Sequence, residues 1–298
     1  MQVKWQGVYP ALLTPFTQDD KIDFLLFEKN LEAQVAAGVH GVIIGGSLGE
    51  ASTLQFEEKR ELVLLAKAKL RDTIPVILNI AEASTAEATA LAKHAVSWGA
   101  DGLMLLPPMR YKSDDRETAT YFKSVAVATD LPIMIYNNPV DYKIDFHPAL
   151  FDQLVEYPTI QALKESSRDV TNLTRMLNRF GDRFKILCGV DTLALEEICL
   201  GAHGWVAGLV DAFPRETVAI WELAQAGKLN EARSIYRWFM PLLELDIHPK
   251  LVQYIKLAAQ ETGIGSEWVR PPRLPLEGEE RTRVLSIIRN AIANRPVI

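Results

Sequence analysis

The sequence predicts an α/β protein of the (β/α)8-barrel class, because short apolar runs alternate with longer amphipathic stretches eight times along the chain. Several of the short runs, such as GVIIGG and DGLMLL, are continuously apolar, which is typical of parallel strands covered on both faces. A doubly wound open sheet is the alternative. It usually has fewer units, and no GxGxxG motif follows any of the runs.

Eight strands are expected at the apolar runs: Val8–Leu13, Gly41–Ile44, Val76–Ile80, Gly102–Leu106, Ile133–Asn137, Ile160–Lys164, Phe184–Cys188 and Trp205–Ala207. The helices that follow them are expected at Phe24–Ala37, Phe56–Leu70, Thr85–Trp98, Glu117–Ala128, Pro148–Val155, Val170–Phe180, Leu193–Leu200 and Pro214–Ala226. Three more helical patterns follow, at Leu229–Leu243, Lys250–Thr262 and Glu279–Ala293. We therefore expect a barrel over residues 1–226 and a C-terminal helical extension of the same domain over residues 227–298.

Composition excludes several classes of protein. The chain of 298 residues is 48% hydrophobic and 23% charged, as in soluble globular proteins. Its formal net charge of −6 argues against a nucleic-acid surface, which needs clustered Lys and Arg. Two cysteines without metal-ligand spacing, no apolar signal core and no membrane-length apolar run lead us to expect a cytoplasmic protein without a membrane partner.

Two polar residues end apolar strands, where a (β/α)8 barrel gathers its functional groups. Lys164 ends the sixth run, in IQALKESS, and a lysine directed into a barrel loses hydration, so its neutral amine can attack a carbonyl. Tyr136 ends the fifth run, in IMIYNNP, and its phenol could pass protons to the substrate carbon. On position alone, the better explanations are a lysine that is solvated or paired with Glu165 and a tyrosine whose ring packs in the core with its hydroxyl at the rim.

Two loops add candidates. GGSLGE, from Gly45 to Glu50, could hold a carboxylate with consecutive amides, and Ser47 could relay a proton to Tyr136. The alternative is an ordinary turn between a strand and a helix. In GVDT, Asp191 and Thr192 could hydrogen-bond substrate hydroxyls, or either could cap the next helix.

Together these segments resemble the dihydrodipicolinate synthase/N-acetylneuraminate lyase family, from GVYPALLTPF near the start to RPPRLPL near the end. Its most specific parts are GGSLGEASTL, YNNP, the KES lysine and GVDT, in that order. The resemblance implies a class I aldolase-type lyase in which Lys164 forms a Schiff base with C2 of a 2-oxo acid or its cyclic imine. Tyr136 would transfer protons to and from the substrate, and Ser47 would relay a proton to Tyr136. It implies no metal or organic cofactor, and a homotetramer built as a dimer of dimers.

The resemblance also implies a set of substrate-binding residues. The backbone amides of Ser47 and Leu48 would hold the substrate carboxylate. The remaining positions carried over from the family are Gly46, Gly189, Asp191, Thr192 and Val206.

Departures from the synthase pattern bear on the substrate. Ser47 and Leu48 stand where dihydrodipicolinate synthases carry two threonines in the glycine loop. The relay of hydroxyl groups in those enzymes is therefore interrupted at Leu48 in this chain. VDYKID lacks the arginine that binds a second carboxylate, and PPM at Pro107 to Met109 replaces a tyrosine pair, with Tyr111 shifted. The pattern is closer to 1-pyrroline-4-hydroxy-2-carboxylate deaminases, which eliminate the 4-hydroxyl and release ammonia to give 2-oxoglutarate semialdehyde.

Three alternatives stay open at this point: a 2-keto-3-deoxy sugar acid aldolase or dehydratase, a dihydrodipicolinate synthase, and a non-catalytic 2-oxo acid binding protein. Because VDYKID offers no arginine, we expect a monocarboxylate substrate.

Overall fold

The strands form one closed parallel barrel. The computed structural model of the chain describes residues 1–108 and 111–298. Within them, hydrogen-bonded neighbours follow the order β1-β8-β7-β6-β5-β4-β3-β2. The strands are β1 (Gly7–Pro10), β2 (Val42–Ile44), β3 (Val76–Ile80), β4 (Gly102–Leu105), β5 (Ile133–Asn137), β6 (Ile160–Glu165), β7 (Lys185–Cys188) and β8 (Gly204–Ala207). A parallel bridge from Ala11 to Ile43 joins the two ends of the sheet.

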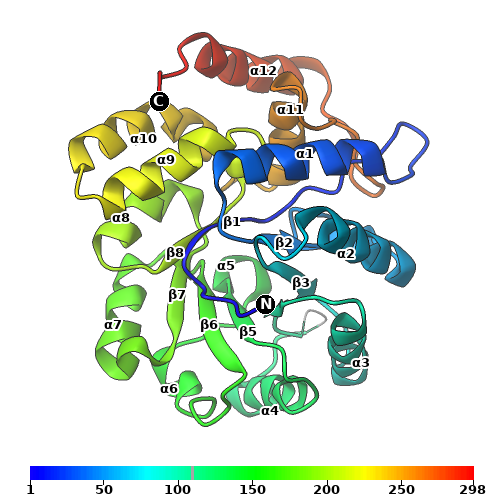
Figure 1. Cartoon of the computed structure of the whole chain (residues 1–298), viewed down its shortest axis with the longest axis vertical. Helices are drawn as coiled ribbons and strands as arrows, with labels where there is room; N and C mark the ends of the chain where they lie inside the picture. The colour runs from blue at the N-terminus through cyan, green and yellow to red at the C-terminus, as the bar shows by residue number, and fades with distance from the viewer. Residues whose placement is uncertain (109–110) are drawn as a thin grey trace.

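Helices surround the strands (Figure 1). Their bounds are α1 (Phe24–Ala37), α2 (Phe56–Leu70), α3 (Thr85–Ser97), α4 (Asp115–Ala126), α5 (Pro139–Tyr142), α6 (Pro148–Phe151), α7 (Val170–Phe180), α8 (Ala194–Cys199), α9 (Pro214–Gln225), α10 (Leu229–Leu243), α11 (Leu251–Glu261) and α12 (Gly278–Ala293). Single 3₁₀ turns lie at Ala51–Thr53, Gly181–Arg183, Asp191–Leu193 and Leu209–Asp211. The predicted (β/α)8 barrel is confirmed.

All eight expected strands are present, with bounds that differ by a few residues at most. The apolar run that starts at Val8 forms regular strand only to Pro10, and Ala11 follows with a single parallel bridge to Ile43. The four-residue helix α5 was not expected. Asn138 caps it by accepting from the Asp141 amide at 3.1 Å, and Pro139 occupies its first turn.

The C-terminal helices are tied to the glycine loop by a buried ion pair. The Lys256 ammonium on α11 lies 2.5 Å from the Glu50 carboxylate, and neither side chain is exposed to solvent. The backbone amide of Arg270 donates to the same carboxylate at 3.1 Å. The segment after the barrel therefore helps to fix the loop that contains Ser47.

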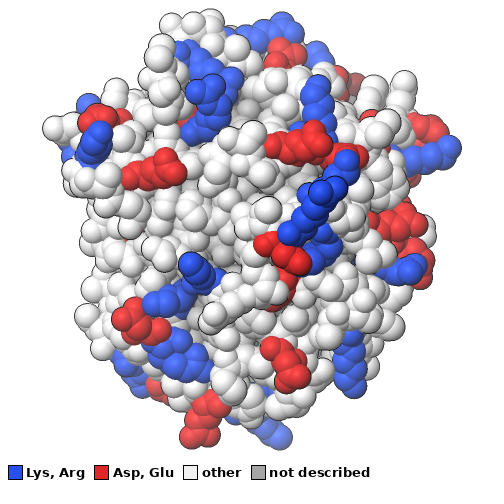
Figure 2. All heavy atoms as spheres, in the orientation of Figure 1, with Lys and Arg blue, Asp and Glu red and all other residues white. Residues whose placement is uncertain are grey.

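Surface charge is mixed on the face shown in Figure 2, where acidic and basic side chains are interspersed. Among the described residues, no helix combines the length and the apolar character needed to cross a bilayer.

Candidate active site

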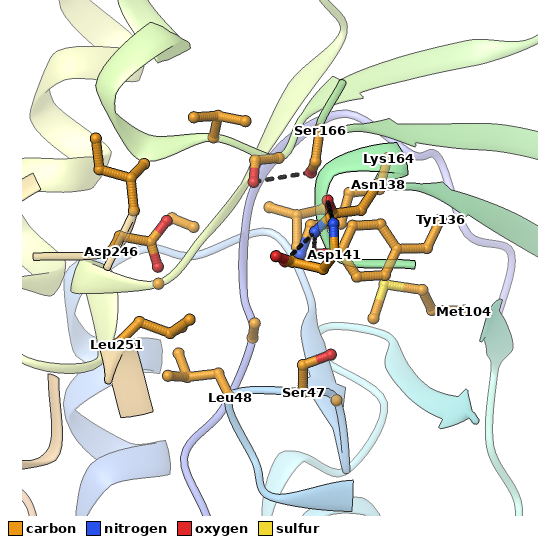
Figure 3. A pocket seen from close by; sticks show the side chains of 18 of the residues that line it. Ser47, Leu48, Met104, Tyr136, Asn138, Asp141, Lys164, Ser166, Asp246 and Leu251 are labelled. Atoms are coloured by element: carbon orange, nitrogen blue, oxygen red, sulfur yellow. Dashed lines mark hydrogen bonds between the residues drawn. The ribbon is translucent and has the colours of Figure 1, made fainter. Parts of the chain in front are cut away.

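Lys164 and Tyr136 occupy the same level of the barrel on adjacent strands. Tyr136 on β5 is the register partner of Lys164 on β6, and the Lys164 Nζ lies 4.1 Å from the centroid of the tyrosine ring. Both side chains point into the cavity of Figure 3. Burial lowers the pKa of Lys164, although the nearby Asp246 opposes this shift. The structure therefore favours a neutral, nucleophilic amine.

The Tyr136 hydroxyl accepts a hydrogen bond from the Asn138 side-chain amide at 3.2 Å. Burial raises the pKa of Tyr136 to about 12, against the opposing effect of this bond. At neutral pH the phenol therefore keeps its proton. It can donate that proton to a substrate group beside the amine.

The glycine loop presents unpaired amides to the same cavity. Its backbone is fixed by the Asn79 side chain, which donates to the Gly45 carbonyl at 2.9 Å, and by Thr14, which donates to the Gly49 carbonyl at 2.8 Å. Within residues 1–108 and 111–298, the amides of Ser47 and Leu48 find no protein acceptor. Two adjacent N–H groups without partners suit a carboxylate.

A second tyrosine joins the site from helix α5. The hydroxyl groups of Ser47 and Tyr142 lie 2.5 Å apart and share a hydrogen bond. The rings of Tyr142 and Tyr136 pack edge to face, with centroids 5.5 Å apart. The sequence analysis missed Tyr142, although the Asn-Pro pair at 138–139 is a signal for a helix start that would have placed it near Tyr136.

The cavity has a small inner part and a larger outer part. The inner cavity, of about 80 Å³, contains Lys164 and Tyr136. The outer cleft, of about 930 Å³, contains neither of them. Residues that line both parts mark the passage between them: Ser47, Asp141, Tyr142, Arg168, Asp246, Ile247 and Leu251. Only the reacting end of a substrate fits beside Lys164, so the rest must extend past these residues.

The structure brings most of the expected residues to the inner cavity. Its lining includes Gly46, Ser47, Leu48, Gly189 and Val206 together with Lys164 and Tyr136. Gly189 leaves room for the amine, because a Cβ at this position would lie 2.7 Å from the Lys164 Cε and 2.1 Å from the Ser166 Oγ.

Asp191 and Thr192 do not line either part of the cavity. The Asp191 carboxylate accepts from the Trp205 indole and from the Leu209 amide, each at 2.8 Å, and its side chain is fully buried. Its oxygen atoms are thus engaged in holding β8 and the turn that follows it. The structure gives no support to substrate-hydroxyl binding by these two residues.

An arginine lines the cavity, but it comes from a segment other than VDYKID. VDYKID supplies none, and Asp141 from that segment lines the cavity instead. Arg168, four residues after Lys164, nevertheless lines both parts of the cavity and has a positive φ of 64°. A non-glycine residue in this backbone region is uncommon and often marks a functional site.

Asp246 is the other residue that the sequence analysis missed. It lies in the connection between α10 and α11 and reaches the passage from the C-terminal segment. Burial raises the pKa of its carboxyl well above the ordinary value, and the nearby Asp191 carboxyl adds to this shift. No sequence motif links it to the barrel strands, so only the folded chain reveals its place.

Two further expectations concern the segment after β4 and metal ions. Met109 lies outside the described residues, and Tyr111 is 57% exposed. In the part of the chain that the structure describes, no group of three or more His, Cys, Asp or Glu side chains is placed to hold a metal ion.

Comparisons with known proteins agree with this geometry. The model of the dihydrodipicolinate synthetase family matches residues 4–291. The 4-hydroxy-tetrahydrodipicolinate synthase of Exiguobacterium sibiricum is 34% identical over 275 residues, which cover 91% of this chain and 92% of the relative. The corresponding enzyme of Methanothrix thermoacetophila is 30% identical and covers 95% and 96% of the two chains.

Solved structures extend the likeness to three dimensions. Dihydrodipicolinate synthase from Aquifex aeolicus superimposes with a TM-score of 0.91 at 28% identity, over 98% of this chain and 99% of that chain. A dihydrodipicolinate synthase from Bacillus anthracis gives a TM-score of 0.92 at 27% identity, over 97% and 99%. Both likenesses extend over nearly the whole of each chain.

Proposed function

The chain belongs to the dihydrodipicolinate synthetase family, and we propose that it forms a Schiff base between Lys164 and a small 2-oxo acid or cyclic imine. It is a class I aldolase-type lyase of that family. The observation that carries the proposal is the buried Lys164 amine, 4.1 Å from the centroid of the Tyr136 ring. The cytoplasmic location and the homotetramer expected from the resemblance remain predictions.

The chemistry begins with the amine. Neutral Lys164 attacks C2 of the substrate, and the resulting carbinolamine loses its hydroxyl as water when Tyr136 donates a proton. The Tyr136 phenolate then removes a proton from C3 of the iminium, which gives the enamine and restores the phenol. Each proton is accounted for within the pair of Lys164 and Tyr136.

The substrate carboxylate binds to the glycine loop. The amides of Ser47 and Leu48 have no protein acceptor among the described residues and belong to the lining of the inner cavity. Amides already fixed in place stabilise an anion without the cost of reorganising during the reaction. Because these amides and Lys164 line the same inner cavity, a carboxylate held by the amides keeps C2 in the cavity that contains the amine.

Within this chemistry we propose deamination of 1-pyrroline-4-hydroxy-2-carboxylate to 2-oxoglutarate semialdehyde. Asp141 and Asp246 line the passage through which the rest of the substrate extends. Carboxyl groups there accept hydrogen bonds from a substrate hydroxyl and favour a protonated imine. Ser47 followed by Leu48 and the segment VDYKID match the deaminase-like pattern.

Synthesis of 4-hydroxy-tetrahydrodipicolinate is the second candidate. Relatives with that name match more than nine-tenths of the chain. Arg168 also supports it, because its guanidinium is a planar donor that could bind a second carboxylate at the rim of the cavity.

One panel of assays separates the candidates. Purified protein is given 4-hydroxy-1-pyrroline-2-carboxylate, pyruvate with aspartate semialdehyde, and 2-keto-3-deoxy sugar acids in separate reactions. Ammonia release in the first reaction alone supports the deaminase. Consumption of aspartate semialdehyde identifies a synthase, and pyruvate release from a sugar acid identifies an aldolase. A protein that gains no mass at Lys164 after borohydride reduction with any substrate is not a Schiff-base enzyme.

A further inference from the structure

We propose that Asp246 is the acid that protonates the hydroxyl group lost from C4 of the substrate. This inference rests on the proposed deamination of 1-pyrroline-4-hydroxy-2-carboxylate and assigns a donor to a step that Lys164 and Tyr136 do not supply. The observation that carries it is the position of Asp246, which lines the inner cavity together with Lys164 and also lines the outer cleft.

Loss of the 4-hydroxyl group needs a proton donor. Hydroxide is a poor leaving group, and a positioned acid that converts it to water as the bond breaks lowers the barrier. Lys164 is engaged in the bond to C2, and Tyr136 serves C3. A third group is therefore needed beside C4, two bonds beyond the carbon that is joined to Lys164.

The residues that line the passage offer few other donors. A guanidinium such as that of Arg168 does not release a proton in proteins. The Tyr142 hydroxyl is already engaged in a hydrogen bond, and burial raises the pKa of this tyrosine. The Asp141 carboxyl accepts from the Asn138 side-chain amide at 2.7 Å, so one of its oxygen atoms is committed within the segment of α5. Asp246 is the remaining acid of the passage.

The position of the Asp246 carboxyl is fixed against the end of β8. A Cβ at Gly208, which also lines the inner cavity, would lie 2.6 Å from the Asp246 Oδ1, so only a glycine lets the carboxyl approach this closely. Figure 3 shows Asp246 across the cavity from Tyr136, with its carboxyl directed toward the space between them. The C-terminal segment thus supplies an acid to the side of the substrate that faces away from the phenol.

The surroundings of Asp246 retain its proton until the hydroxyl departs. Burial raises the pKa of the carboxyl and the Asp191 carboxyl adds to this shift, whereas Lys164 and Arg168 oppose it. Burial also lowers the pKa of Lys164, so the enclosed cavity favours a neutral amine beside a protonated carboxyl. Loss of the hydroxyl creates the iminium cation and the Asp246 anion together, and their attraction stabilises the products of the step.

The step is balanced in atoms and electrons. On the Lys164 enamine, the nitrogen lone pair forms the C2=N bond, the C2=C3 pair moves to C3=C4, and the C4–O pair leaves with the oxygen. The Asp246 proton converts that oxygen to water. Solvent in the outer cleft, which Asp246 also lines, returns a proton to the carboxylate, and no oxidant or reductant is needed.

The test compares two leaving groups. Purified protein is given 4-hydroxy-1-pyrroline-2-carboxylate, with ammonia release as the readout, and its 4-fluoro analogue, with fluoride release measured by an electrode. Fluoride is a much weaker base than hydroxide, so it departs with little help from an acid. Borohydride trapping followed by mass spectrometry reports the Lys164 adduct in each protein.

Three variants are compared with the wild-type protein. Asp246→Asn keeps the shape of the side chain and removes its acidic proton. Asp141→Asn makes the same change at the other carboxyl of the passage. Asp182→Asn is the control, because it removes a carboxyl whose side chain is 87% exposed.

We expect Asp246→Asn to keep the Lys164 adduct and to lower kcat for ammonia release by about 10²–10⁴-fold, the usual scale for a lost general acid. Fluoride release should fall far less, because that leaving group needs no proton. Asp141→Asn should raise KM more than it lowers kcat, and Asp182→Asn should match the wild-type protein with both substrates.

Other results would overturn the inference. Ammonia release at the wild-type rate by Asp246→Asn leaves the deaminase intact and assigns the donor to another group, as does a fall in kcat confined to Asp141→Asn. Loss of the adduct, or an equal loss with both leaving groups, means that Asp246 acts before the hydroxyl departs. Absence of ammonia release by the wild-type protein overturns the proposed deamination and this inference with it.

Discussion

Tyr136 and Lys164 are register partners on adjacent strands, and this pairing sets the distance between the phenol and the amine. The two strands are hydrogen-bonded to each other, so the pair belongs to the rigid part of the barrel. Side chains fixed by a scaffold in this way lose little conformational freedom when the substrate binds. The geometry of the reacting groups is thus largely established before a substrate arrives.

The first prediction concerns the protonation of Lys164. Burial lowers the pKa of its amine from the ordinary value of 10.5, so the neutral fraction at any pH below that value is larger than for a solvated lysine. We expect borohydride trapping with pyruvate to reach half its maximal rate well below pH 10.5. Lys164→Ala should abolish the adduct, whereas Lys185→Ala, which removes a lysine paired with Asp182, should not. A trapping midpoint at or above 10.5 would contradict a buried, neutral amine.

The second prediction tests the space at Gly189. In Gly189→Ala the new Cβ would collide with the side chains of Lys164 and Ser166 and displace the amine. We expect a loss of adduct formation, together with a modest fall in the midpoint of thermal unfolding, because an added carbon in a packed site costs about 1–3 kcal/mol. Gly46→Ala is a comparison within the same cavity lining, because it adds the same carbon without displacing the amine: its Cβ would meet the Met104 Cε at an ordinary 3.6 Å. Equal trapping by the two variants would show that Gly189 is not needed for the position of Lys164.

The third prediction concerns Asp246. Among the groups that oppose the lowered pKa of Lys164, the Asp246 carboxyl has the largest effect. Asp246→Asn removes this carboxyl and with it the effect that opposes the lowered pKa, so the Lys164 pKa should fall further and the trapping midpoint should move to lower pH. Asp141→Asn provides the comparison, since Asp141 lines the same cavity and should leave the midpoint unchanged. A shift to higher pH in Asp246→Asn would contradict this electrostatic relationship.

The fourth prediction concerns stability. Lys256→Met removes the ammonium partner of the buried Glu50 carboxylate and leaves it with the Arg273 guanidinium 3.6 Å away, which should lower the free energy of unfolding by about 3 kcal/mol. Chemical denaturation measures this loss. The exposed pair of Lys250 and Glu280 offers a control, because Lys250→Met should cost no more than about 1 kcal/mol.

A double variant sharpens the stability test. Glu50→Gln combined with Lys256→Met removes both buried charges, and it should recover part of the stability lost in Lys256→Met alone. A double variant that is less stable than either single variant would indicate that Glu50 acts mainly through its other contacts, such as the Arg270 amide.

The sequence predicted the barrel well because the pattern of strands and helices is local. Continuously apolar runs identify strands buried on both faces, and β3 and β5 begin and end at the expected residues. Lys164 and Tyr136 were predictable because each lies at the end of a strand, and the glycine loop because it follows a strand directly. The ends of parallel strands meet at one edge of the barrel.

The missed residues depend on contacts that the sequence does not encode locally. Asp246 reaches the cavity from a connection far along the chain, so its role requires the packing of the C-terminal helices. Asp191 follows a strand as expected, but its carboxylate turns to the Trp205 indole. Tyr142 reaches the site through α5, a four-residue helix that was not among the expected elements and that brings its ring against Tyr136.

Helix α5 contributes to the site without belonging to the barrel wall. Its four residues include Asp141 and Tyr142, and neither takes part in the strand ladder. Substitutions in this short segment can therefore redirect substrate preference while the strands that bear the nucleophile stay the same. New substrate preferences on this scaffold can therefore arise by substitutions in α5, just after the fifth strand, without changes in the strands themselves.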